Sequence, residues 1–301
     1  MARFNRRDAL ILIVALIVAP VVILGRLWWG AVSGAERRQQ ADPFRIAGDF
    51  YFVGANDVTS FLLTGPEGHV LIDGGRPGTA AMIMESVASL GFDIKDVKVL
   101  LNSSPERDYA GGLAELQKAS GARLWASEAS AGTIASGGDD PAIPWPLSTL
   151  GQFGVLRYPA ARVDNTLKDG GTIRVGPIAL TPHVTGGSTR GCTSWTFDVR
   201  DVFNGETRVL KVVHACELQG SRGFRYAEQH ADIERSLRVL RNLPADIWVT
   251  SRGRPWGRYR KSVASQEAKK AAKNPVDAFI DPDGYRAYLA AAEEEFRGGV
   301  H

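Results

Sequence analysis

The sequence contains few of the residues that form metal sites and cross-links. Its 301 residues include two cysteines and five histidines, and the histidines stand far apart, at positions 69, 183, 214, 230 and 301. Two cysteines cannot build a disulfide framework or a four-cysteine zinc site, and histidines this scattered form no local zinc motif. A small disulfide-held protein and a zinc-finger module are therefore excluded.

The sequence also lacks the positive charge that nucleic-acid binding requires. Residues 1–40 hold six arginines against Asp8 and Glu36, a balance of +4, so the rest of the chain carries −1 of the net +3. We therefore expect no nucleic-acid partner. Hydrophobic residues make up 44% of the chain, which excludes disorder and indicates enough apolar side chains for a sizeable core.

The N-terminal residues have the pattern of an export or membrane-targeting segment. Arginines precede Ala9–Gly25, a run of 17 residues without a charge, and Trp28 and Trp29 follow it. This length lies between a long signal-peptide core and a short membrane-spanning helix, and the preceding arginines place the N-terminus inside. Either a cleaved signal or an anchor retained in the inner membrane fits this pattern.

The predicted organisation has three parts. These are a signal or membrane anchor at residues 1–35, a linker at 36–42 and one domain at 43–301. We expect this domain to be exported, either free in the periplasm or held by the N-terminal helix on the outer face of the inner membrane.

From residue 43 onward, short strand patterns are followed by helical patterns, and this order occurs twice. The main strands are predicted at 49–53, 59–64, 69–73, 97–102, 122–126, 171–175, 178–184, 193–199, 207–216 and 246–250. Helices are predicted at 79–90, from about 109 to 120, and at 231–242, 262–273 and 283–296. Asn204-Gly205 is typical of a hairpin turn, and the repeated order favours two packed sheets with helices outside.

Several motifs, taken in order, resemble the metallo-β-lactamase superfamily. They are His69–Gly75, Leu100–Ser103, Asp108–Gly112, Leu167–Gly170, Thr181–Thr189, Gly191–Trp195, Leu243–Ile247 and Asn274-Pro275. The chain is similar in particular to the third subclass of metallo-β-lactamases over residues 43–297. The resemblance implies an α/β fold, a four-layer αβ/βα sandwich, placed after the N-terminal hydrophobic helix. It also implies an active site along one edge, where loops leave the strands.

The zinc ligands of that family are largely missing here. The resemblance places the six ligand positions at Ser104, Glu106, Asp108, Tyr109, Ser188 and Arg252. Only at Asp108 does this sequence have the residue type that the family uses as a ligand, so five of the six positions are substituted. Hydroxyl groups are poor zinc ligands, and a guanidinium carries a permanent positive charge that repels a cation. We therefore expect no metal and no other cofactor, and we expect dizinc catalysis to be lost.

The same six residues predict a polar cleft. Glu106 and Asp108 are the candidate catalytic residues, since two carboxylates can act as acid and base. The alternative is that Asp108 caps the helix that starts near Tyr109 and pairs with a cation. We predict that Arg252 bridges Asp108 and Glu106, and that the hydroxyl groups of the cleft complete the network.

A basic stretch follows the last predicted core strand. It contains Arg252, Arg254, Trp256, Arg258 and Tyr259. One interpretation is a solvated loop leading into a helix. The other is a binding surface for an anionic ligand, a partner protein or lipid headgroups, because Arg, Trp and Tyr are enriched at binding hot spots.

The two cysteines fall nearly opposite each other in the predicted hairpin. An exported domain meets an oxidising compartment, so Cys192 and Cys216 could form a cross-strand disulfide. A shift of one residue in the strand register would place the two thiols on opposite faces. The sequence therefore leaves the disulfide open.

Two classes of function remain. The first is a zinc-free pseudoenzyme with a binding or regulatory role. The alternative is a hydrolase of β-lactams or of other esters or amides that uses a non-standard or metal-free site. Because a fold does not fix a function, the ligand positions and the metal content must discriminate between them.

Overall fold

The computed structural model describes residues 41–139, 157–218, 226 and 228–298. Ala41–His301 forms one compact unit. The predicted signal or anchor at 1–35 and most of the linker lie outside the described residues. Within the described ranges, no helix combines the length and apolar character needed to cross a bilayer.

The first sheet has seven strands in sequence order. They are β1 (Phe44–Ala47), β2 (Phe50–Phe52), β3 (Phe61–Leu63), β4 (His69–Ile72), β5 (Val97–Leu101), β6 (Arg123–Ala126) and β7 (Asn165–Thr166). The strands from β1 to β4 pair antiparallel, and those from β4 to β7 pair parallel. All four residues of β4 are buried because this strand is covered on both faces.

The second sheet has five strands and is built around a long hairpin. Its order is β12 (Ile247–Thr250), β11 (Glu206–Ala215), β10 (Thr193–Phe203), β9 (Ile178–Val184) and β8 (Ile173–Val175). Asn204 and Gly205, with φ of 51° and 82°, join β10 to β11. Two positive φ angles suit the right-handed twist of a hairpin, and the predicted turn is confirmed.

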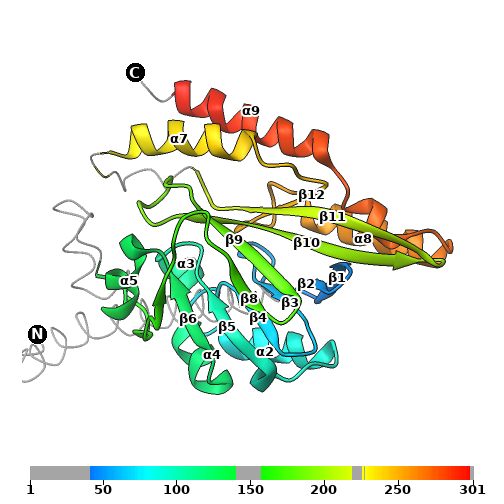
Figure 1. The fold of residues 1–301 in the computed structure, drawn as a ribbon, viewed down its shortest axis with the longest axis horizontal. Helices are drawn as coiled ribbons and strands as arrows, with labels where there is room; N and C mark the ends of the chain where they lie inside the picture. Colours follow the sequence, from blue (N-terminus) through cyan, green and yellow to red (C-terminus); the bar gives the residue numbers. More distant parts are fainter. Residues whose placement is uncertain (1–40, 140–156, 219–225, 227, 299–301) are drawn as a thin grey trace, which may run out of the picture. The chain divides into compact units, whose positions relative to one another are not determined.

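Helices cover the outer faces of both sheets (Figure 1). α2 (Ala80–Ser89) and α4 (Leu113–Ser120) pack on the first sheet through one apolar cluster. α7 (Gln229–Arg241) and α9 (Pro282–Gly298) lie side by side over the second sheet. A second apolar cluster fills the space between the sheets, where the ring of Phe50 meets that of Phe197 at 5.0 Å. The predicted mixed α/β fold with two sheets and external helices is confirmed.

The remaining helices and turns complete the unit. They are α3 (Arg107–Ala110), α5 (Glu128–Ala135), α8 (Arg258–Lys270) and the 3-10 turns η1 (Ile94–Asp96) and η2 (Pro275–Ala278). The sequence pattern did not predict α5, because its small residues carry no strong apolar periodicity. Ser127 caps it, accepting a hydrogen bond from the backbone N–H of Ser130 at 3.2 Å.

Four loops that leave the carboxyl ends of strands meet at one edge. They follow β5, β9, β11 and β12. The backbone N–H of Thr193 donates to the carbonyl of Ser103 at 2.8 Å, and that of Ser188 donates to the carbonyl of Glu217 at 3.0 Å. The residues that the sequence singled out therefore share one edge, because the strand order brings these loops together.

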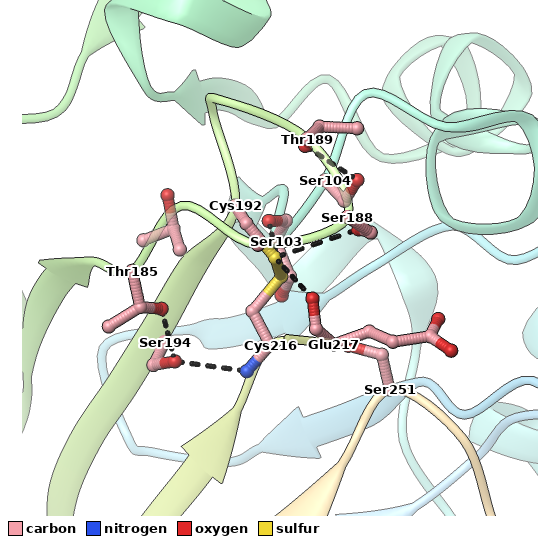
Figure 2. The surroundings of a disulfide bond; sticks show 12 residues. Ser103, Ser104, Thr185, Ser188, Thr189, Cys192, Ser194, Cys216, Glu217 and Ser251 are labelled. Carbon is pink, nitrogen blue, oxygen red and sulfur yellow. Dashed lines mark hydrogen bonds between the residues drawn. A yellow bond between two sulfur atoms is a disulfide. The ribbon is translucent and has the colours of Figure 1, made fainter. Parts of the chain in front are cut away.

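A disulfide joins Cys192 to Cys216 beside this edge (Figure 2). The last pair in the β10–β11 ladder before the cysteines is Trp195 with His214. Both cysteines lie just beyond the paired strands, with Cα atoms 5.8 Å apart. Because the chain has left the ladder there, strict alternation of faces no longer separates the two side chains. The possibility that the sequence left open is therefore realised.

The disulfide can be checked by counting thiols. We expect the protein denatured without reductant to contain no free thiol, since both of its cysteines are cross-linked. The same protein treated with reductant should show two thiols per chain. Titration with a thiol-reactive dye measures both values, and two thiols in the unreduced sample would contradict the structure.

Candidate functional site

The six ligand-equivalent positions gather at the shared edge and form two groups. Ser104, Glu106 and Ser188 make the first group, and Asp108, Tyr109 and Arg252 make the second. The positions that the family resemblance marked as ligands therefore lie close together in space. We call the two groups together, with the residues that pair to them, the cleft network.

In the first group, two buried hydroxyls hold one carboxylate. Ser188 Oγ donates to Glu106 Oε2 at 2.9 Å, and Ser104 Oγ donates to the same oxygen at 3.1 Å. Ser104 Oγ also lies 3.2 Å from Thr189 Oγ1. Burial raises the pKa of Glu106, the hydroxyl of Ser188 opposes this shift, and the negative charge of Glu217 adds to it.

In the second group, Asp108 lies between two guanidinium groups. Arg252 Nη1 is 3.0 Å from Asp108 Oδ2, and Arg76 Nε donates to Asp108 Oδ1 at 2.9 Å. Arg76 also pairs with Asp57 at 2.9 Å. Burial alone would raise the pKa of Asp108, but Arg76 and then Arg252 outweigh it and hold that pKa below its usual value.

Asp108 therefore pairs with cations and does not cap the helix. The residue at the cap position of α3 is Glu106, and its side chain makes no capping hydrogen bond. Asp108 stands within the first turn, and both of its oxygens face guanidinium groups. Two charge-assisted contacts outcompete a bond to a backbone N–H. The predicted pairing is present, and the predicted cap is wrong.

Arg252 bridges two carboxylates, but the second is not Glu106. Its Nε lies 3.4 Å from Glu217 Oε2, and its guanidinium lies over the ring of Tyr109 at 5.4 Å. The hydroxyl of Tyr109 donates to the same Glu217 oxygen at 2.5 Å. Glu217, at the end of β11, reaches Arg252 directly, whereas Glu106 turns to the serine hydroxyls. The predicted bridge to Glu106 is corrected accordingly.

Two members of the cleft network were missed from the sequence. Arg76 follows Gly74-Gly75, and Glu217 directly follows Cys216. Neither position belongs to the family's ligand motifs, and both are brought in by strand order over long sequence distances. One signal could have revealed Arg76. The predicted cleft held two carboxylates, Asp108 and Glu106, but only one cation, Arg252, and two ionised carboxylates need more than one positive charge nearby.

Some residues of the basic stretch are buried and others are exposed. Trp256 and Arg258 are 1% and 7% exposed, so they belong to the interior. The ring of Trp256 packs against that of Phe61 at 6.2 Å, and Arg258 donates to Asn56 Oδ1. Arg254 is exposed, as is Tyr259 at 73%. The middle of the segment is therefore interior, because burial of the apolar ring of Trp256 is favourable, and Arg254 and Tyr259 remain at the surface.

The donor set of the cleft network does not suit zinc. Both oxygens of Asp108 are occupied by guanidinium groups, and the Glu106 oxygen that faces the first group accepts two hydroxyls. Across the part of the chain that the structure describes, no three His, Cys, Asp or Glu side chains are arranged to hold a metal ion. Two permanent positive charges in the site oppose a divalent cation further.

The fold and its edge site are those of a known class. The sequence model of the metallo-β-lactamase superfamily matches residues 53–203, and this chain belongs to that superfamily. Among solved structures it is similar to the Rm3 metallo-β-lactamase, with 37% identity and a TM-score of 0.75. That match covers 88% of this chain and 95% of the other.

The likeness extends to one subclass within the superfamily. MEM-A1, a subclass B3 metallo-β-lactamase from a soil metagenome library, is 32% identical with a TM-score of 0.74, over 87% of this chain and 96% of its own. The predicted resemblance to the third subclass is thereby confirmed. A Cronobacter sakazakii metallo-β-lactamase with a HARLDQ motif is 30% identical with a TM-score of 0.74, over 87% of this chain and 95% of its own. Aspartate stands fifth in that motif, as Asp108 does in Ser104–Tyr109.

Proposed function

We propose that this chain is an exported metallo-β-lactamase-like domain that works without zinc, as a binding or regulatory protein. The observation that carries the proposal is the ion pair of 3.0 Å between Arg252 and Asp108. Arg252 stands where the family resemblance places the final zinc ligand. A guanidinium there supplies a fixed positive charge to the carboxylate that the metal would otherwise neutralise.

The cleft network supports this proposal because its charged groups pair with one another. Arg252 contacts two carboxylates, Arg76 contacts two, and Tyr109 donates to Glu217. Such a network holds the cleft in one arrangement without a metal. In the binding role that we propose, the chain's own side chains fix the shape and charge that a ligand meets.

Export is supported by two independent features of the chain. The uncharged run Ala9–Gly25 follows an arginine-rich start, and the folded domain contains the Cys192–Cys216 disulfide. Disulfides persist in oxidising compartments such as the bacterial periplasm and are rare in the cytosol. On this proposal the domain functions in the periplasm or on the outer face of the inner membrane.

A second candidate function is hydrolysis at a metal-free site. The observation that favours it is the contact of 2.9 Å between Ser188 Oγ and Glu106, which resembles a nucleophile beside a base. Ser188 is 3% exposed and Ser104 is fully buried, so a substrate carbonyl would reach neither hydroxyl without an opening of the cleft. The binding role is therefore the better supported of the two.

Metal content and turnover test the proposal together. Protein purified after growth with added zinc is expected to hold well under one zinc per chain, and to hydrolyse neither a β-lactam nor an activated ester above background. The reason is that the donor set lacks the nitrogen and thiolate ligands that zinc requires. Elemental analysis gives the first value, and absorbance assays give the second.

Each outcome bears on a different part of the proposal. Stoichiometric zinc that resists chelator, together with β-lactam turnover, would overturn it. Ester or amide turnover by metal-free protein, lost in Ser188→Ala, would establish the second candidate instead. A control is Ser136→Ala, which alters an exposed serine that hydrogen bonds locally and lies outside the cleft network.

A further inference from the structure

A cavity opens from the cleft network toward helix α9. Its volume is about 240 Å³. Among the side chains that line it are Glu217, Leu218, Arg252, Pro255, Tyr288 and Ala292. Glu217 and Arg252 therefore face the network on one side and this cavity on the other. The remaining lining residues named here are apolar or aromatic.

The charge around the cavity is negative. The cleft network contains three carboxylates, those of Glu106, Asp108 and Glu217, and the two guanidinium groups of Arg76 and Arg252. A fourth carboxylate, that of Asp57, pairs with Arg76 at the border of the network. Glu295 adds a further carboxylate to the cavity lining. The two arginines are already paired within the network, so an anionic ligand would meet no uncompensated cation here.

Glu217 keeps hydrogen-bonding capacity on the cavity side. The contacts of its carboxylate to Arg252 and Tyr109 both use Oε2. Among the described residues, none contacts Oε1 within hydrogen-bonding distance, although a carboxylate oxygen accepts readily. Glu217 therefore lines the cavity with one carboxylate oxygen that is still free to accept a hydrogen bond.

Tyr288 gives the cavity an aromatic wall and a second polar group. Its ring stacks on that of Trp248 with centroids 5.0 Å apart, which fixes its orientation. Its hydroxyl makes no hydrogen bond within the described part of the chain. Burial, followed by the charge of Glu217, raises the pKa of Tyr288, so this hydroxyl stays neutral at neutral pH.

We propose that this cavity binds a small organic ammonium ion. Its N–H groups donate to Glu217 Oε1, and its apolar part packs against Tyr288, Pro255 and Ala292. A divalent cation is a poor occupant, because it needs about six oxygen ligands and the walls are largely apolar. An aromatic face beside a carboxylate suits an ammonium ion in both charge and shape. The inference rests on the proposed function, since it requires Glu217 and Arg252 to stay in the zinc-free arrangement.

The test compares three probes of similar shape and different charge. The full exported domain is titrated calorimetrically at neutral pH with benzylammonium, benzyl alcohol and benzoate at matched ionic strength. We expect saturable binding of benzylammonium, binding of benzyl alcohol that is weaker by about tenfold or more, and no binding of benzoate. Equal affinity for the alcohol, or tighter binding of benzoate, would overturn the inference.

Variants locate the binding event. Glu217→Gln keeps the shape of the side chain and should weaken benzylammonium binding by about tenfold, while benzyl alcohol binding stays unchanged. Ala291→Phe fills the mouth of the cavity from α9 and should abolish binding of benzylammonium. Ala287→Phe is the matched control, because Ala287 is exposed on the same helix outside the cavity lining, and it should bind as the unaltered protein does.

The outcomes separate this inference from the function on which it rests. Unchanged affinity in Ala291→Phe would show that benzylammonium binds elsewhere and would overturn the inference. Zinc content is measured on the same sample. A zinc-loaded sample overturns the proposed function, whereas a zinc-free sample that fails to bind benzylammonium overturns this inference alone.

Discussion

Replacing Arg252 with alanine is expected to lower the free energy of unfolding by about 3 kcal/mol. The substitution removes an ion pair from Asp108 and another from Glu217, whose side chains are 23% and 32% exposed and so only partly buried. Removing one partner of a buried pair costs on the order of 3–5 kcal/mol, because the other charge stays desolvated. The lower end applies here, since Asp108 keeps Arg76 and Glu217 keeps the hydroxyl of Tyr109.

Neighbouring substitutions make this prediction specific. Arg254→Ala removes an exposed arginine two residues away and should change stability by less than about 0.5 kcal/mol. Arg252→Lys keeps the charge but loses the fork of donors, so an intermediate loss is expected. Urea denaturation at neutral pH measures all three variants. An Arg252→Ala protein as stable as Arg254→Ala would show that the ion pairs contribute nothing.

Asp73→Asn is expected to flatten the dependence of stability on pH between about 4 and 7. Asp73 is 1% exposed, and burial raises its pKa to about 7, although hydrogen bonds from Ser103 oppose the shift. The backbone N–H of Ser103 donates to Oδ1 at 2.7 Å, whereas Oδ2 has no partner among the described residues. The folded protein therefore holds a proton on Asp73 that the unfolded chain releases near pH 4.

The sign of the effect follows from this raised pKa. Stability from the protonated Asp73 is fully present below the unfolded pKa and is lost as pH rises through the folded pKa. The loss is on the order of 1 kcal/mol for each pH unit within that window. Asparagine has the shape of the protonated acid and does not titrate, so the variant should match the unaltered protein at pH 4 and exceed its stability at pH 8.

Denaturation curves at several pH values give this difference directly. Because other groups titrate in the same range, the informative quantity is the difference between Asp73→Asn and the unaltered protein. Asp198→Asn, at an exposed position on β10, is the matched control and should leave the slope unchanged. Parallel curves for Asp73→Asn and the unaltered protein would contradict a raised pKa.

Sequence patterns predicted the two sheets because strand signals in this chain are local. The run Val97–Leu101, apolar except for the exposed Lys98, and the turn at Asn204-Gly205 each determine an element without distant partners. The convergence of Ser104, Asp108 and Arg252 also followed from the sequence through the family resemblance. Each of these residues sits on a loop at the carboxyl end of a strand, and the strand order brings the loops together.

The sequence could not predict which side chains pair with each other within the cleft network. Arg252 had two carboxylates within reach, and the selection of Glu217 over Glu106 depends on where β11 ends. Trp256 was assigned to a surface because arginines flank it, yet its ring contributes to the core. In both cases long-range packing decides between options that are equivalent in a local window.

The interlocked ion pairs have an evolutionary consequence. A histidine at position 252 alone would remove a cation from Asp108 and Glu217 without completing a zinc site, because the hydroxyl residues at 104 and 188 remain. A histidine at position 109 alone would remove the hydroxyl that donates a hydrogen bond to Glu217. Each single reversion therefore costs stability and returns no metal. On the proposed function, a dizinc centre could arise in this chain only through several coordinated replacements, because the effects of neighbouring substitutions in one network are not additive.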